Sequence, residues 1–197
     1  MKLLFSLLFL SLMLDASAQC EYSVVQYNKE TQKATLESFP VAIDLIETPF
    51  NARIVLASFT RTGDQYFLEL EITEDSSTKD LKPICFEAGT RLSFSLKNNS
   101  ITSIAQIEDK ICGVKSYDRK TGYTTVSNYA NFVITQHAYD ILIKSEIILM
   151  KIISEDYEET FVLKDELEDM VDGEIAVTHP SRFFIEGIEC MTNPKFE

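Results

Sequence analysis

The chain has 197 residues, of which 31 are Asp or Glu and 18 are Lys or Arg, so its formal net charge is −13. This negative charge argues against a nucleic-acid-binding protein, because DNA and RNA would repel it. Hydrophobic residues make up 45% of the chain, which is enough for a packed core and argues against intrinsic disorder.

The first 18 residues have the three parts of a secretory signal peptide. A basic start is followed by an almost wholly apolar run at residues 3–14 and by a small-x-small cleavage sequence at residues 16–18. The apolar run has 12 residues, whereas a membrane span needs about 20, so a membrane anchor is disfavoured. We therefore expect cleavage after Ala18 and one β-rich domain, residues 19–197, with no transmembrane segment. Such a protein would be exported, either to a periplasm or out of the cell.

All four cysteines lie after the predicted leader, and an even number in an exported chain indicates two disulfides. Three connectivities are open, and we favour Cys85–Cys112 together with Cys20–Cys190. The first would close a loop around a predicted hairpin, and the second would tie the two chain ends together. No Cys-x-x-Cys is present and no cysteine lies near a histidine, so a zinc or redox site is disfavoured.

Alternation of apolar and polar residues predicts strands over most of the chain. The clearest case is residues 66–72, whose apolar set (Tyr66, Leu68, Leu70 and Ile72) should face a core. Residues 53–59 are the expected partner strand, reached through a turn at Thr62-Gly63-Asp64. A second hairpin is expected from residues 92–96 and 101–107.

The second half continues in the same way. Residues 146–153 are nearly all apolar, which predicts a central strand with both faces buried, and residues 160–163 return beside it. Further strands are expected at residues 22–27, at 35–46 with a break at Pro40, and at Arg182 to Ile188, which would close the sheet.

Two short helices interrupt the strands. One begins at Thr135, an N-capping residue, and the other spans Lys164 to Asp172 and stops at Gly173. The expected fold is mostly β with these two short helices. It is a β-sandwich or a partly open barrel, with α+β at the margin of the prediction.

The run from Glu155 to Glu174 holds ten carboxylates against one base, Lys164. Its Glu166 and Asp169 are candidate binding residues for a basic protein partner, because opposite charge speeds association. The run lacks the spacing of an EF-hand loop, so we expect no cofactor beyond weak surface binding of calcium. A solvated helix face and hairpin tip would explain the same run without a partner.

A second set of candidate binding residues is Tyr117, Arg119, Tyr123 and Tyr129, which lie in a polar segment. Tyrosines beside cationic residues can bind a protein surface or stack on a sugar ring. The alternative is a long hairpin whose tyrosines cover the sheet.

The chain carries only two histidines, and it lacks Gly-x-Ser-x-Gly, His-Glu-x-x-His and Gly-rich phosphate loops. We therefore name no catalytic residue and expect a binding protein rather than an enzyme, with a protein partner favoured over a small molecule. Two other classes stay open. One is a β-barrel that carries a small apolar ligand, and the other is an envelope hydrolase that uses paired carboxylates.

Two stretches resemble uncharacterised secreted β-rich proteins of the Bacteroidota. The first is Ala18-Gln19-Cys20 at the end of the leader, and the second is residues 127–135 followed by residues 147–153. The resemblance implies an exported compartment rather than an activity, and it assigns a role to no residue.

Overall fold

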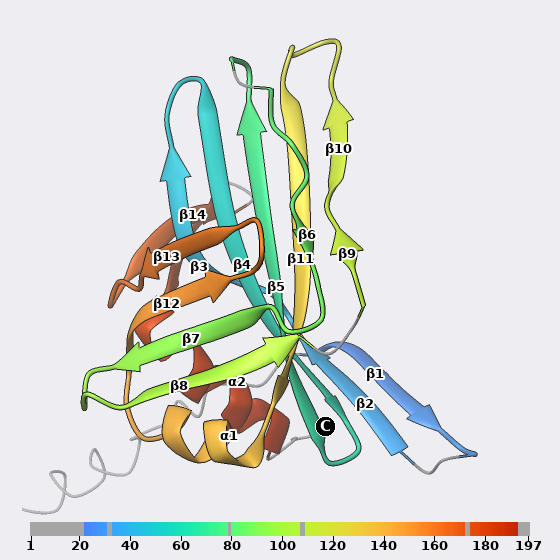
Figure 1. Ribbon diagram of the computed structural model, residues 1–197, viewed down its shortest axis with the longest axis vertical. Coiled ribbons are helices and arrows are strands. Elements are labelled where there is room, and N and C mark those ends of the chain that lie inside the picture. Colours follow the sequence, from blue (N-terminus) through green and yellow to red (C-terminus); the bar gives the residue numbers. More distant parts are fainter. Residues whose placement is uncertain (1–21, 31–32, 79, 107–108, 172–173, 193–197) are drawn as a thin grey trace, which may run out of the picture.

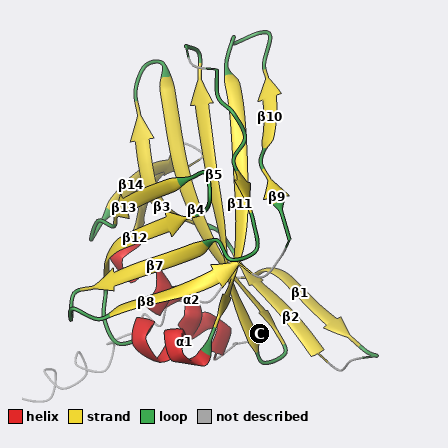
Figure 2. Cartoon of the chain, in the orientation of Figure 1, coloured by secondary structure: helices red, strands yellow, loops and turns green. Residues whose placement is uncertain are grey.

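The computed structural model describes residues 22–30, 33–78, 80–106, 109–171 and 174–192. The predicted leader and Cys20 lie outside this part. Most described residues are in strands, and two short α-helices lie at one end of the molecule (Figures 1 and 2), so the predicted mostly β class is confirmed.

One antiparallel sheet of 11 strands dominates the fold, in the order β1-β2-β4-β5-β11-β8-β7-β12-β13, with β3 beside β4 and β10 beside β11. It does not close into a barrel, since the strands at its two ends, β1 and β13, are not paired with each other. Its strands are β1 (Tyr22–Asn28), β2 (Lys33–Ser38), β3 (Val41–Glu47), β4 (Asn51–Thr62), β5 (Gln65–Ser76), β7 (Arg91–Leu96), β8 (Ile101–Gln106), β10 (Val114–Tyr117), β11 (Thr124–Ile134), β12 (Ile147–Ile153) and β13 (Glu158–Val162).

Two small two-stranded sheets and the helices complete the fold. They are β6 (Cys85–Phe86) with β9 (Ile111–Cys112), β14 (Leu167–Val171) with β15 (Glu174–Thr178), α1 (Gln136–Leu142), the 3₁₀ turn η1 (Pro180–Arg182) and α2 (Phe183–Thr192).

The long strands β4, β5 and β11 form the centre of the sheet, and Figure 1 shows β7, β8, β12 and β13 running across them. The register of β5 is continuous on both sides, from Asn51↔Ser76 to Thr62↔Gln65 with β4 and from Thr124↔Ser76 to Ile134↔Tyr66 with β11. The turn between β4 and β5 uses Gly63 at φ 62°, as expected.

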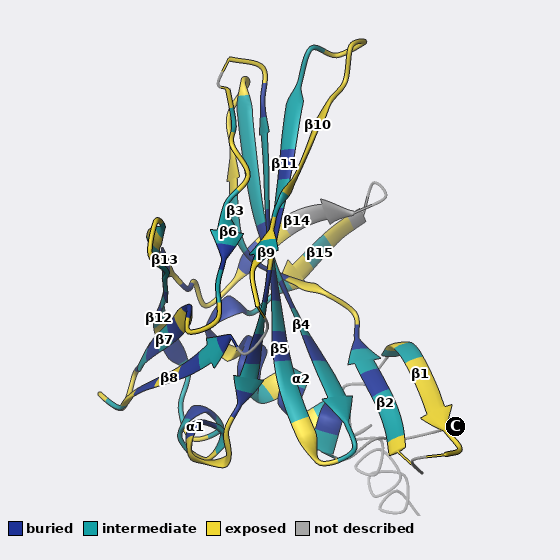
Figure 3. Cartoon of the chain, turned by 45° about the vertical axis from the view of Figure 1, so that its right-hand side comes forward, coloured by how far each residue is buried: buried dark blue, intermediate teal, exposed yellow. Residues whose placement is uncertain are grey.

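The core lies between the long strands and the crossing strands (Figure 3). Leu68, Leu70 and Ile72 of β5 are at most 2% exposed, so the predicted inward face is confirmed. The facing strands supply Leu92, Phe94, Met150 and Ile152. The sheet is therefore folded over onto itself, as in a sandwich whose layers cross.

The second predicted hairpin is present as β7 and β8, with Asn99 of its turn at φ 64°. Strand β12 is central, since it lies between β7 and β13. The prediction that both of its faces are buried is wrong in part, because Ile148 is 41% exposed.

Two predictions of local structure near the C-terminal end are wrong. The predicted closing strand Arg182 to Ile188 belongs to η1 and α2, whose buried residues Phe183, Phe184, Ile188 and Met191 have helical spacing. The predicted helix Lys164 to Asp172 contains β14, which pairs residue for residue with β15. Leu167 is buried there as a strand residue, because hydrogen bonding to β15 outweighs a helical pattern that is only two turns long.

The predicted helix at Thr135 is confirmed. The Thr135 hydroxyl accepts a hydrogen bond from the backbone N–H of Ala138, which makes it the N-cap of α1. Ala138 and Leu142 form its buried face.

The predicted Cys85–Cys112 disulfide is also confirmed, and its two cysteines stand opposite each other in β6 and β9. The bridge encloses the β7–β8 hairpin, as the sequence suggested. Cys190 is disulfide-bonded as well, while its predicted partner, Cys20, lies outside the described residues.

Helix α2 approaches β4 closely because Gly187 has no side chain. A Cβ atom at Gly187 would lie 2.3 Å from the Phe59 ring, which also packs against the rings of Phe183 and Phe184. Contacts this short force the helix or the ring to move.

We therefore expect Gly187→Ala to destabilise the fold by about 1–3 kcal/mol, although Gly to Ala in a helix usually stabilises. Urea unfolding of the variant beside Glu189→Ala, an exposed change in the same helix, measures this. An unfolding midpoint for Gly187→Ala at or above that of the wild type would contradict the packing described here.

Candidate binding groove

Three of the predicted binding residues lie at one tip of the long strands. Tyr117 ends β10 and is 61% exposed, and Arg119 and Tyr123 lie in the loop to β11. The Tyr123 hydroxyl donates to the carbonyl oxygen of Pro49 at 3.2 Å, which ties this loop to the turn between β3 and β4. Tyr123 therefore makes a structural contact at this tip.

The same loop is held by Asp118. Its carboxylate accepts hydrogen bonds from the backbone N–H of Lys120 at 2.8 Å and from the Thr121 hydroxyl at 2.9 Å, and these bonds lower the pKa of Asp118 below its usual value.

The acidic run does not form a single free surface. Glu158 pairs with Lys151 at 2.6 Å, Asp165 pairs with Lys97 at 3.1 Å, and Glu159 pairs with Arg53. Glu166 is exposed in the link between β13 and β14, and Asp169 lies in β14, where its side chain is outside the described part. Several of these carboxylates already have cationic partners within the chain.

Arg53 of β4 joins the two layers of the fold. It donates to Asp44 of β3 at 2.7 Å and to Glu159 of β13, and it lies over the ring of Phe161 at 5.4 Å. Burial alone would lower the pKa of Arg53, but the hydrogen bond to Asp44 and the charge of Glu159 outweigh it and raise that pKa. Burial, together with its hydrogen bond to Glu159, also raises the pKa of Tyr157 well above its usual value.

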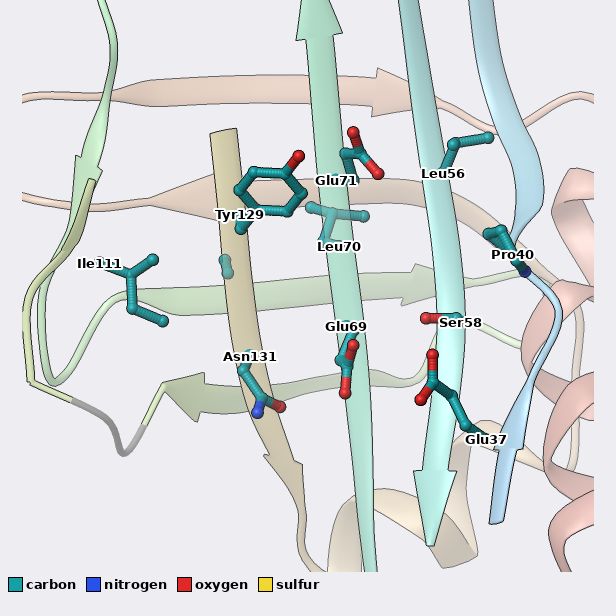
Figure 4. Close-up of a pocket in the computed structure, with 11 residues that line it drawn as sticks. Glu37, Pro40, Leu56, Ser58, Glu69, Leu70, Glu71, Ile111, Tyr129 and Asn131 are labelled. Atoms are coloured by element: carbon teal, nitrogen blue, oxygen red, sulfur yellow. The ribbon is translucent and has the colours of Figure 1, made fainter. Parts of the chain in front are cut away.

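The fourth tyrosine, Tyr129, lies elsewhere, on the outer face of the sheet away from the core. There it borders a groove of about 360 Å³ that is open to solvent (Figure 4). The groove is lined by Glu37, Pro40, Leu56, Ser58, Glu69, Leu70, Glu71, Ile111, Tyr129, Ala130 and Asn131.

The floor of the groove follows from the register of β5. Since Leu68, Leu70 and Ile72 face the core, Glu69 and Glu71 face outward. Cross-strand pairing builds two rows on this face. Glu71 stands between Leu56 and Tyr129, and Glu69 stands between Ser58 and Asn131.

Two other parts of the chain form the sides. Pro40, between β2 and β3, lies on one side, and Ile111 of β9 lies on the other (Figure 4). Ile111 is held by the Cys85–Cys112 bridge and by the N–H of Gly113, which donates to the Ile84 carbonyl at 2.9 Å. A Cβ atom at Gly113 would lie 2.2 Å from the Asn128 side-chain oxygen, so only glycine fits at this crossing.

The charged side chains that line the groove are negative. The described lining includes Glu37, Glu69 and Glu71 and contains no Lys, Arg or His. Hydroxyls hold two of these carboxylates in place, since Thr60 donates to Glu69 at 2.8 Å and Thr73 donates to Glu71 at 3.0 Å. Tyr129 is 42% exposed beside them. This arrangement suits a cation whose apolar stem can pack on Leu56, Pro40 and the Tyr129 ring.

Of the predicted binding residues, the structure brings Tyr129 alone into this groove. Glu37, Glu69 and Glu71 were not identified as site residues from the sequence. The alternation along β5 does predict that Glu69 and Glu71 face solvent. Their convergence depends on pairing between strands that are far apart in sequence, which no local pattern shows.

Within the described residues, no group of three or more His, Cys, Asp or Glu side chains is arranged to hold a metal ion. None of the described helices has the length and apolar character of a membrane span.

Comparison with protein-family models gave no match, and neither did comparison with curated proteins or with solved structures.

The bridge that holds Ile111 should contribute substantially to stability. Cys85 and Cys112 are 27 residues apart, so loop-closure entropy predicts that replacing both by Ser costs about 3–4 kcal/mol. Urea unfolding of the double variant under oxidising conditions measures this loss. An unchanged midpoint would contradict this stabilisation by the bridge.

Proposed function

We propose that this protein is an exported, non-enzymatic binding protein of the cell envelope or exterior, and that its acidic groove engages a basic protein partner. One observation carries the proposal. Three carboxylates and a half-exposed tyrosine share a hollow whose described lining contains no cation.

Charge supports this proposal at long and short range. The net charge of −13 would attract a basic partner from a distance and raise its rate of association. In the groove, Glu69 and Glu71 hold fixed positions because each accepts a hydrogen bond from a threonine. Fixed acceptors lose little freedom on binding, which favours affinity.

The groove also has apolar surface suited to a protein side chain. Leu56, Pro40 and Ile111 offer aliphatic contacts, and the Tyr129 ring offers a face for a Lys or Arg head group. A free metal ion or a polyanion would use neither feature.

Export is supported by the predicted leader together with the Cys85–Cys112 bridge, since disulfides persist outside the cytoplasm. A carrier for an apolar ligand is less well supported. The sheet is open, and large side chains such as Phe86, Phe94 and Phe132 fill the core.

The proposal predicts that octalysine, a defined basic probe, binds the protein and that the groove provides the affinity. Glu37→Gln/Glu69→Gln/Glu71→Gln should weaken binding about tenfold, because it removes three ion pairs of roughly 0.5 kcal/mol each. The matched control Glu30→Gln/Glu47→Gln/Glu189→Gln removes the same charge from exposed positions outside both the groove and the acidic run, and it should change affinity less than about twofold.

Titration calorimetry at about 50 mM and about 300 mM salt measures both variants, and binding should weaken as salt rises. Equal losses in the two variants would place the affinity in the overall charge rather than in the groove. Absence of binding at low salt would contradict the proposed function itself.

A further inference from the structure

We infer that the groove recognises an extended segment carrying basic residues at alternate positions, aligned along β5. This inference rests on the proposed function and specifies its partner.

The spacing of the two central carboxylates supports it. Glu69 and Glu71 project from the same face of one strand at alternate positions (Figure 4), which places their Cα atoms about 7 Å apart. Alternate side chains of any extended peptide repeat at the same distance. A segment parallel or antiparallel to β5 can therefore set one cation against each carboxylate.

The groove allows this direction and not the perpendicular one. Ile111 lies on one side and Pro40 on the other, so the open path between them runs along the strands (Figure 4). A segment lying across the strands would meet both sides and would place only one of its basic residues near β5.

The two positions differ in chemistry. Beside Glu71 lie the Tyr129 ring and Leu56, which suit a cation with a planar or apolar flank, above all Arg. Beside Glu69 lie Ser58 and Asn131, and Glu37 points to the same end of the groove (Figure 4). This end offers two carboxylates and polar hydrogen-bonding partners, which suit a Lys ammonium group.

The spacing is rigid. Strand β5 is paired along its whole length with β4 on one side and β11 on the other, so Glu69 and Glu71 cannot move independently along the strand. A helical segment with basic residues four apart has a comparable repeat, but a helix about 10–12 Å wide does not fit a hollow of this size.

The experiment uses short peptides with blocked ends that each carry one Arg and one Lys and no other charged residue. These are placed at adjacent positions, at alternate positions, or with two or three residues between them. Chemical-shift titration of the ¹⁵N-labelled protein measures their dissociation constants. The alternate peptide should bind about threefold more tightly than the others, since only it completes both ion pairs.

Variants of the protein sharpen the test. Glu69→Gln should abolish the preference for alternate spacing while leaving weak binding through Glu71. Glu168→Gln, an exposed carboxylate of β14, should keep the preference unchanged. Equal affinity for all spacings would overturn the inference, as would preference for the widest spacing.

These outcomes are distinct from failure of the proposed function. If octalysine and all the peptides leave the protein unbound at low salt, the groove is not a site for basic partners. If octalysine binds in the groove and spacing has no effect, the proposed function stands and the inference of an aligned, extended segment fails.

Discussion

The register of β5 between its two neighbours is the constraint on which both the core and the groove depend. Because side chains alternate along a strand, a register that sends Leu68, Leu70 and Ile72 inward must send Glu69 and Glu71 outward. A slip of one residue would bury two carboxylates and expose the centre of the core. Stability of the fold and orientation of the acidic floor are thus two consequences of one pairing. The outward carboxylates stay partly exposed and each accepts a hydrogen bond from a threonine, which keeps the cost of placing negative charge here low.

The chain segment between β5 and β11 connects the two faces of this sheet. It follows β5 after residue 76, forms the β7–β8 hairpin that crosses over the core, and returns through β9 to the outer face. The Cys85–Cys112 bridge cross-links this segment and holds Ile111 in place at one side of the groove. At the other end of the sheet, the ion pairs of Arg53 hold β13 against β3 and β4. The groove therefore lies on a sheet whose inner face packs on the core and which the disulfide and the Arg53 ion pairs hold in place.

Local patterns predicted much of this architecture. Alternation identified β5 and both hairpins, and the capping residue Thr135 identified α1, because each signal acts within a few residues of its element. The patterns failed at β14 and α2, where short apolar segments fit a helical period and a strand period equally well and tertiary packing decided between them. The residues of the groove could not be predicted from local sequence patterns, for a different reason. Glu37, Glu71 and Tyr129 meet only through the pairing of β2 with β4, of β4 with β5 and of β5 with β11.

The central claim is that basic ligands bind on the outer face of β4, β5 and β11. Mapping amide chemical shifts of the ¹⁵N-labelled protein during titration with octalysine tests it most directly. The account predicts saturable shifts concentrated at residues 56–58, 69–71 and 129–131, on the rows that form the groove floor. Shifts concentrated instead at residues 155–168, or at the tip around residues 117–123, would contradict it. They would place the interaction on the acidic run or on the tyrosine loop.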